Sequence, residues 1–286
     1  MQLYGAVEIG GTKTVVAVGS TFADMSDPVR VTTSDPDSTL GDVIDFFSDY
    51  DLQAVGVASF GPLNLDRSSS GYGTMLSTPK PGWSGTPLLR RLQSELGIPV
   101  HLDTDVNGAA VGEGRWGAAQ GLSDYSYVTV GTGIGAGIVV GGKTVGGKRH
   151  PEMGHIVVSR LDGDRHEGSC PYHGDCLEGM AAGPALEARF GRPDIWPGNE
   201  QVLRLAVHYL RQGMLNLVYI AGPERIIVGG GVSRLPRLHE SLRERLGALI
   251  AKYPEIPDLD LLISRPQLDE RSGLAGAFLL ANPEAG

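Results

Sequence analysis

The chain has 286 residues, of which 41% are hydrophobic, enough for one large domain or two of ordinary size. Its formal net charge of −9 argues against nucleic acid or an anionic membrane as a partner, because both need a basic surface. Neither a basic, apolar leader nor an apolar run of about 18 residues is present, so we expect a cytoplasmic protein with no membrane partner. The 42 glycines fall in separate clusters, which predicts tight turns where the backbone approaches something closely.

The first part of the chain alternates apolar strands with helical patterns. Residues 3–9 and 14–18 predict a β-hairpin with glycines at its tip. Asp37 and Ser38 offer an N-cap for the helix that follows. The other elements expected here are strands over 53–59 and 99–102 and helices over 86–96 and 105–116.

The same strand–glycine turn–strand unit returns at residues 126–140, and this internal echo predicts two related halves. It is followed by a helix over 198–221, a strand over 225–228, a helix over 235–250, a strand over 259–263 and a last helix over 272–280. Alternating strands and helices predict an α/β architecture with sheets covered by helices and a cleft between the halves. We place the boundary between residues 117 and 124, a polar stretch that contains glycine.

Three glycine clusters have the composition of phosphate cradles. The first is Glu8-Ile9-Gly10-Gly11-Thr12-Lys13, the second is Gly131-Thr132-Gly133-Ile134-Gly135, and the third is Gly229-Gly230-Gly231. Glycines let backbone N–H groups point into a concavity that binds phosphate oxygens. The first cluster lacks the P-loop spacing and alone is equally typical of a type I′ hairpin turn. The three together predict a nucleoside triphosphate site, with the third cluster at the nucleoside end.

These turns resemble the two phosphate motifs and the adenosine motif of the actin/hexokinase/Hsp70-like ATPases. Pro-Glu-Met-Gly-His from residue 151 and Cys-Pro-Tyr-His-Gly-Asp-Cys-Leu-Glu-Gly from residue 170 narrow the resemblance to ROK-family sugar kinases, over nearly the whole chain. One departure is Glu8, where the family usually has Asp. The resemblance implies that ATP contacts Gly10, Gly11, Thr12, Lys13, Gly131, Thr132, Gly133, Gly135, Gly229, Gly230 and Gly231.

The resemblance also implies a two-domain, ribonuclease H-like α/β fold with its active-site cleft between the domains. The N-terminal domain would comprise residues 1–117 and the C-terminal helix at about 271–286, and the C-terminal domain residues 118–270. Magnesium bridging the β- and γ-phosphates and a homodimeric assembly are implied in the same way.

Asp105 lies where a strand gives way to a helix, the edge of an α/β sheet at which ligands bind. A carboxylate there can act as general base toward a sugar hydroxyl. The alternative is that Asp103, Thr104 or Asp105 simply caps the helix. Resemblance to the Asn-Asp pair of the kinases favours the catalytic role for Asp105, with Thr104 replacing the Asn.

Glu152 and Glu178 match family positions that hydrogen-bond sugar hydroxyls, and carboxylates accept well from neighbouring hydroxyls. Gly61 and Asn64 are further candidates, on the loop after a buried strand. The substrate site expected from the sequence therefore comprises Gly61, Asn64, Thr104, Asp105, Glu152, His155 and Glu178.

Cys170, His173 and Cys176 are spaced as zinc ligands, and a structural zinc needs a fourth. His155 and His166 are the candidates, and the family pattern favours His155. A Cys170–Cys176 disulfide or two free thiols are the competing interpretations. We expect zinc to order the loop with Glu152 and the helix start with Glu178, and so to pre-organise sugar contacts without touching the phosphate.

The cysteine-histidine segment most resembles the fructokinase branch, which implies phosphorylation of fructose at O6. Mannose kinase or broad hexokinase activity is the alternative, because hexoses differ by one hydroxyl orientation. A ROK-type transcriptional repressor would need a helix-turn-helix before the strand that begins at Leu3, so we do not expect one. Asp105 argues against a non-catalytic sugar-binding module.

Overall fold

The computed structural model describes residues 2–253, 255–256 and 258–284. Met1, Pro254, Pro257 and residues 285–286, including the end of the expected terminal helix segment, lie outside them. The chain forms two compact units. The first contains Met1–Gln120, Thr144–His150 and Glu270–Gly286, and the second contains Gly121–Lys143 and Pro151–Asp269. Each unit is built on its own five-stranded sheet.

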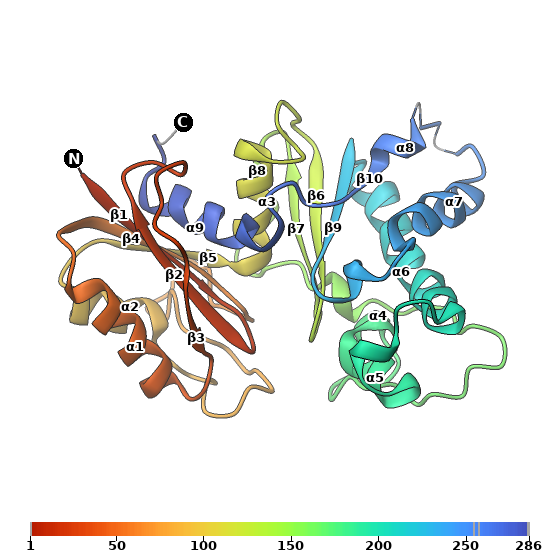
Figure 1. Cartoon of the computed structure of the whole chain (residues 1–286), viewed down its shortest axis with the longest axis horizontal. Helices are drawn as coiled ribbons and strands as arrows, with labels where there is room; N and C mark the ends of the chain where they lie inside the picture. The colour runs from red at the N-terminus through yellow and green to blue at the C-terminus, as the bar shows by residue number, and fades with distance from the viewer. Residues whose placement is uncertain (1, 254, 257, 285–286) are drawn as a thin grey trace. The chain divides into compact units, whose positions relative to one another are not determined.

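The sheet of the first unit has the strand order β3-β2-β1-β4-β5 (Figure 1). β1 pairs with β2 antiparallel and with β4 parallel, and β4 pairs with β5 parallel. The strands are β1 (Leu3–Ile9), β2 (Lys13–Gly19), β3 (Val29–Thr32), β4 (Leu52–Ser59) and β5 (Val100–Thr104). The helices are α1 (Pro36–Ser48), α2 (Leu88–Leu96), α3 (Asp105–Trp116) and α9 (Ser272–Ala281).

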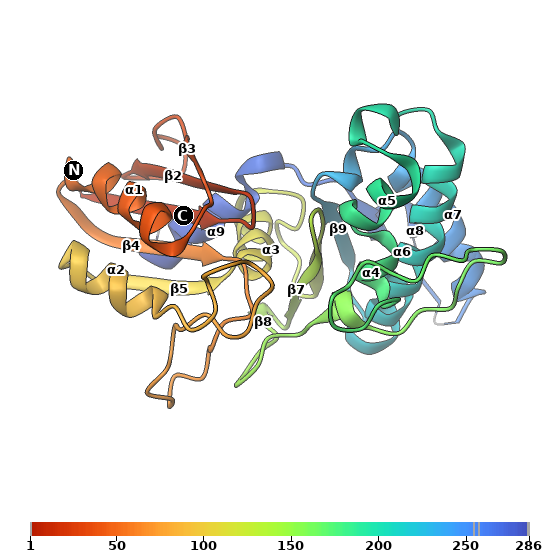
Figure 2. The ribbon, with the colours of Figure 1, turned by 90° about the horizontal axis from the view of Figure 1, so that it is seen from below.

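The two faces of this sheet differ in side-chain size. Val7 and Ile9 point toward the core that includes α1 and α2, which lie side by side in both views (Figures 1 and 2). Ala6 and Ala58 point toward α9. A Cβ at Gly56 would lie 1.8 Å from the carbonyl oxygen of Ala277, so α9 lies very close to the sheet. Since side chains alternate along a strand, Glu8 belongs to the same face as Ala6.

Helices α3 and α9 are in backbone contact. A Cβ at Gly276 would lie 1.9 Å from the carbonyl oxygen of Gly108, and a Cβ at Gly112 would lie 2.5 Å from that of Ser272. No residue larger than glycine fits at these crossings without displacing a backbone. The close approach couples the position of α3, which begins with Asp105, to that of α9.

The sheet of the second unit repeats the first, with the order β10-β9-β6-β7-β8. Here β6 pairs antiparallel with β7 and parallel with β9, as β1 does with β2 and β4. The strands are β6 (Tyr125–Val130), β7 (Ile134–Val140), β8 (Lys143–Thr144), β9 (Arg225–Gly229) and β10 (Ile263–Ser264). The helices are α4 (Leu177–Ala181), α5 (Gly183–Phe190), α6 (Glu200–Ala221), α7 (Leu238–Ile250) and α8 (Leu259–Leu262). The predicted α/β architecture and the two related halves are confirmed.

Two local predictions are wrong. The N-cap of α1 is Asp35, whose side chain accepts from the backbone N–H of Ser38, because Pro36 suits the first helical position. Residues 259–263 do not form a strand. Asp258 accepts from the N–H groups of Asp260 and Leu261 and starts the short helix α8, which leaves two residues for β10.

Across the described part of the chain, no helix combines the length and apolar character needed to cross a bilayer.

Candidate active site and metal cluster

The first glycine turn joins β1 to β2. The N–H of Gly10 donates to the carbonyl of Lys13 at 2.9 Å, which closes the turn. Gly11 and Thr12 are exposed at its tip. Lys80 Nζ donates to the carbonyl of Gly11 at 2.8 Å and to that of Thr33 at 2.7 Å. The sequence reasoning missed Lys80, which lies in a proline-rich loop without a recognisable motif.

Lys13, predicted to contact ATP, is engaged in an ion pair in this unit. Its Nζ lies 3.1 Å from Glu270 Oε2, and the same oxygen accepts from Arg30 at 2.6 Å. The Lys13 side chain is 48% exposed, so this pair is weak and its ammonium is accessible to an anion.

The start of α3 shows which residue caps the helix. Thr104 is the N-cap, and its Oγ1 accepts from the N–H of Asn107 at 3.2 Å. Asp103 Oδ1 accepts from the Asn107 amide at 2.8 Å. Thr104 is therefore the N-cap, and Asp105 Oδ1 accepts from the N–H of Val106 at 2.9 Å in the same first turn. Burial raises the pKa of Asp105 to about 6, so this carboxyl is ionised at neutral pH and is a stronger base than an exposed aspartate.

Glu8 is the penultimate residue of β1 and lies close to Asp105. Burial raises the pKa of Glu8 to about 7, and the negative charge of Asp105 raises it further, while Lys13 opposes the shift. The carboxyl group of Glu8 lies against Gly273 in the first turn of α9, where the backbone N–H of Leu274 lowers its pKa slightly. The contact with α9 is a feature that the sequence did not reveal.

The predicted sugar residues of the first unit lie in two places. Gly61 precedes a cis peptide bond to Pro62 on the loop after β4. Further along that loop, the Asn64 amide accepts from the N–H of Asp66 and donates to Ser69 Oγ, both at 3.1 Å. The Asn64 side chain thus already orders its own loop, as the Thr104 hydroxyl orders α3.

The second and third glycine clusters lie together in the second unit. The N–H of Gly131 donates to the carbonyl of Gly133 at 2.9 Å and closes the turn between β6 and β7. Gly230, after β9, has a φ of 87°, and a Cβ there would lie 2.5 Å from the carbonyl oxygen of Val130. The third cluster therefore packs directly against the strand end from which the second cluster begins.

Glu178 supports the second turn. Its Oε2 accepts from the N–H of Ile134 at 2.9 Å, and a Cβ at Gly133 would lie 2.7 Å from the same oxygen. The N–H of Gly183 donates to the carbonyl of Gly131 at 2.7 Å, so both ends of the turn are held by the α4–α5 region. Sequence reasoning predicted Glu178 as a sugar contact and did not anticipate its hydrogen bond to the second glycine turn.

His155, Cys170, His173 and Cys176 form one cluster, and their ligand atoms all lie within 4.8 Å of one another. His155 Nδ1 is 3.7 Å from Cys170 Sγ and 3.6 Å from Cys176 Sγ, and His173 Nδ1 is 3.8 Å from Cys170 Sγ. Tetrahedral bonds to zinc separate a sulfur from a nitrogen ligand by about 3.6 Å. The residues thus fit a structural zinc ion.

The structure excludes one of the competing interpretations of this segment and leaves the other open. Both cysteines are free and buried, so the disulfide is not formed, whereas two free thiols are compatible with the structure. His166 lies outside the cluster, with its Nε2 3.0 Å from Ser169 Oγ. Burial raises the pKa of the Cys176 thiol to about 11, and a zinc ion would stabilise its thiolate and displace the proton.

The cluster is joined to the second glycine turn on two sides. Cys176 is the N-cap residue of α4, two positions before Glu178. His155 ends the 3₁₀ turn Met153–His155, which begins after Glu152. A Cβ at Gly154 would lie 2.0 Å from the carbonyl oxygen of Ile134. Two segments that carry cluster ligands therefore contact the turn directly.

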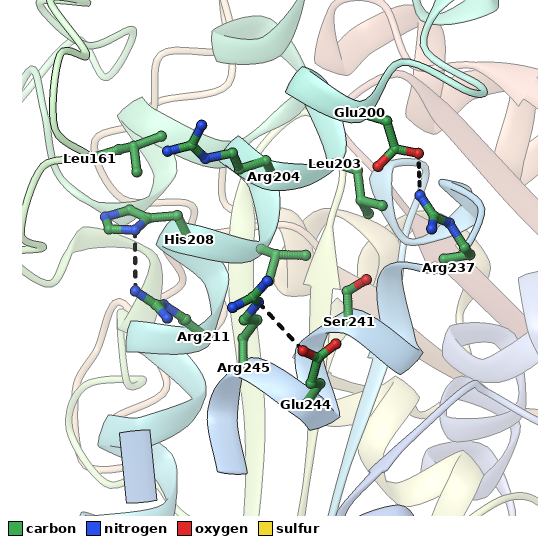
Figure 3. A pocket seen from close by; sticks show the side chains of 11 residues that line it. Leu161, Glu200, Leu203, Arg204, His208, Arg211, Arg237, Ser241, Glu244 and Arg245 are labelled. Atoms are coloured by element: carbon green, nitrogen blue, oxygen red, sulfur yellow. Dashed lines mark hydrogen bonds and ion pairs between the residues drawn. The ribbon is translucent and has the colours of Figure 1, made fainter. Parts of the chain in front are cut away.

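A groove of about 620 Å³ lies on the second unit between α6 and α7 (Figure 3). It contains four arginines and two glutamates, with Arg237 paired to Glu200 and Arg211 donating to His208 Nδ1 at 3.3 Å. None of the residues predicted for ATP, sugar or zinc lines it. The groove is thus separate from the candidate site.

Comparison with known proteins places this geometry in context. The ROK family profile matches residues 4–284. The fructokinases of Pediococcus pentosaceus and Zymomonas mobilis are each 40% identical to this chain, over 98% of it and over 98% and 96% of their own lengths. The solved structure of a ROK family glucokinase from Streptomyces griseus, in complex with glucose and AMPPNP, is similar with a TM-score of 0.79 and 27% identity, over 98% of this chain and 99% of that one. The hexokinase-like α/β fold expected from the sequence is confirmed, and the chain belongs to the ROK family.

Proposed function

We propose that this protein is an ATP:fructose 6-phosphotransferase with Asp105 as its general base. The observation that carries the proposal is the start of α3, where Thr104 caps the helix and Asp105, beside the end of β1, holds a carboxyl with a pKa of about 6. The fructokinases that match almost the full length of the chain support fructose as the acceptor.

In this proposal ATP is held by the glycine turns through backbone N–H groups. The contact between the second and third clusters supports a shared role, with phosphate at the Gly131–Gly135 turn and the nucleoside near Gly229–Gly231. Gly10, Gly11 and Thr12 would bind phosphate at the first turn, with Lys13 and Lys80 contributing positive charge. Magnesium, when bound, would neutralise charge on the β- and γ-phosphates.

Asp105 would accept the proton of the sugar O6 hydroxyl as that oxygen attacks the γ-phosphate. Gly61, Asn64, Thr104, Glu152 and Glu178 remain our candidates for orienting the sugar. His155 is different, because its Nδ1 faces two thiols. We assign it to the metal cluster, where it would orient the sugar only through the segment that carries Glu152.

We propose a structural zinc ion at His155, Cys170, His173 and Cys176. The set provides two sulfur and two nitrogen ligands, which suits zinc and leaves no open position for catalysis. Buried thiols that do not pair with each other suit a reducing compartment, and we retain the cytoplasm as the proposed location. A homodimer also remains a prediction, which light scattering would test.

The decisive experiment is kcat/KM for fructose, mannose, glucose and N-acetylmannosamine under one set of conditions, followed by ADP release. We expect fructose to give the highest value and Asp105→Asn to abolish ADP release with each sugar. A fructose value below that of glucose would refute the fructokinase assignment and leave the sugar kinase assignment intact. Undetectable ADP release with every sugar would refute both.

A further inference from the structure

Glu8 stands where ROK kinases usually have aspartate, and its extra methylene lets the carboxyl group reach a neighbouring helix. The side chain leaves the end of β1 on the face covered by α9. Its carboxyl group reaches the first turn of that helix, next to Gly273, where the backbone N–H of Leu274 lowers its pKa slightly. Helix termini leave such N–H groups without an intrahelical partner, and no side-chain cap is present at Arg271. Glu8 therefore packs against the N–H groups of the first turn of α9 from a distant part of the sequence.

Gly273 provides the space for this carboxyl group. A Cβ at Gly273 would lie 2.5 Å from Glu8 Cδ, 2.7 Å from Oε1 and 2.9 Å from Oε2. Gly273 is an ordinary helical residue and has no positive φ, so its backbone conformation does not require glycine. Alanine there would favour the helix by up to about 1 kcal/mol. The volume taken by Glu8 explains why glycine is present.

The charges around Glu8 come from three other elements. Asp105 faces it from α3, Lys13 from β2 and Glu270 from the 3₁₀ turn before α9. Two neighbouring carboxyl groups in a dehydrated site do not ionise independently, and the first proton is lost from the one with the lower pKa. The pKa of Glu8, about 7, exceeds that of Asp105, about 6. Burial raises the pKa of both groups, so the pair carries less than two full negative charges near pH 6.

We propose that Glu8 is a positioning residue that locks the start of α9 to β1, with Gly273 as its size-matched partner, and that this lock holds α3 and Asp105 in place. The path of the effect is short, because α9 and α3 are in backbone contact at Gly276 and Gly108. The expected effect on kcat rests on the proposed function, in which Asp105 is the base. The packing of Glu8 against Gly273 does not depend on that role.

A size swap tests the lock. Gly273→Ala should lower Tm by about 3–8 °C, because the methyl group and the Glu8 carboxyl cannot both fit. Glu8→Asp should lower kcat about tenfold while the fructose KM changes less than about threefold, since the base is misplaced and the sugar contacts are kept. In the double variant Glu8→Asp/Gly273→Ala the shorter carboxyl makes room for the methyl group. Its Tm should return to within about 2 °C of that of Glu8→Asp.

Two further variants complete the test. Gly41→Ala is the matched control, because Gly41 also lies in a helix and a Cβ there meets nothing within 4 Å. It should leave Tm and kcat unchanged or raise Tm slightly. Glu8→Gln keeps the length of the side chain and should retain kcat within about threefold at pH 7. It should also abolish any inflection of the kcat–pH profile near pH 7 and retain the loss of kcat as the pH falls through about 6.

Additive Tm losses in the double variant would overturn the lock, and so would Glu8→Gln behaving like Glu8→Asp. Because Tm needs no turnover, the swap remains decisive if the protein phosphorylates no sugar, a result that would refute the proposed function alone. Full compensation in Tm with kcat unaffected by Glu8→Asp would overturn the link from the lock to Asp105.

Discussion

The two glycine turns look alike in sequence and in sheet topology, but they are supported differently. Glu8 lies on the strand that leads into the first turn, and its carboxyl group packs against α9. Behind the second turn is Glu178, which comes from another segment, 44 residues further along the chain, and accepts from the N–H of Ile134. In each case a glycine provides the space for the carboxyl group, Gly273 in the first unit and Gly133 in the second.

This difference separates the surroundings of the two turns. Glu8, which precedes the first turn, packs against α9, and α9 contacts the sheet and α3 through alanine, glycine and backbone atoms. The second turn depends on a short helix that starts at a metal-ligand candidate, Cys176. The duplicated strand–turn–strand unit therefore lies beside closely packed helices in one half and beside a proposed zinc site in the other.

The largest effect is expected at the base, in the unit of the first turn. Asp105→Asn keeps the size of the side chain and removes the proton acceptor, so kcat should fall about 10²-fold or more, with binding of ATP and fructose retained. Steady-state kinetics measure kcat, and isothermal titration measures the binding of ATP and fructose. Asp103→Asn is the control, because its Oδ1 can still accept from Asn107. Near-normal kcat in Asp105→Asn would end the assignment.

At the second turn, Gly133→Val should raise the ATP KM about tenfold and the fructose KM by a smaller factor, because the displaced Glu178 is also a candidate sugar contact. The added side chain meets the Glu178 carboxylate, whose hydrogen bond to Ile134 N–H holds the turn. Gly41→Ala is the control, since a Cβ there meets nothing within 4 Å and Gly41 is not among the predicted ATP contacts. Thr12→Val should affect ATP similarly at the first turn. Equal changes in both KM values would mean that the turns are structural only.

Metal removal should disturb the second turn and leave the first turn unaffected. Chelation or Cys176→Ser should release about one zinc ion per chain, lower Tm and raise the ATP KM about three- to tenfold, through Glu178 and the second turn. The sugar KM should rise as well, through the segment with Glu152. Elemental analysis, thermal unfolding and kinetics measure these changes. Purified protein without zinc would refute the metal proposal, and an unchanged ATP KM after zinc loss would refute the link to the turn.

The sequence predicted those parts of the molecule whose signal is local. The apolar runs of β1 and β6, the glycine turns after them and the helix that starts at Asp105 were all found, because periodicity and glycine spacing are written in consecutive residues. The cysteine–histidine spacing likewise led to four residues that the structure brings together. The failure at residues 259–263 was also local, since Asp258 outweighed the apolar pattern by capping a helix.

What the sequence did not reveal are contacts between distant segments. Glu8 and Gly273 are far apart in the chain, and neither has a pattern that points to the other. The same applies to Lys80 at the carbonyl of Gly11 and to Glu178 at Ile134. Sequence reasoning therefore assigned Glu178 by family position to the sugar alone, and expected the metal cluster not to touch the phosphate region. The hydrogen bond from the N–H of Ile134 to Glu178 instead links the helix that starts at Cys176 to the second glycine turn.

The smallest expected effect is on the pH dependence of stability, and it concerns the first turn. The pKa of Glu8 is raised on folding from 4.5 to about 7, so the folded state keeps a proton that the unfolded state loses. The contribution of protonated Glu8 to the free energy of unfolding is thus fully present below pH 4.5 and is lost as the pH rises to about 7. Glu8→Gln cannot ionise, so its free energy of unfolding should decline less over this range, by at most about 1.4 kcal/mol per pH unit. Asp105→Asn should reduce the decline between pH 3.8 and about 6 for the same reason. Urea unfolding at pH 5, 6 and 7 measures the slopes. Identical slopes for wild type and Glu8→Gln would show that the first turn is not backed by a buried, protonated carboxyl group.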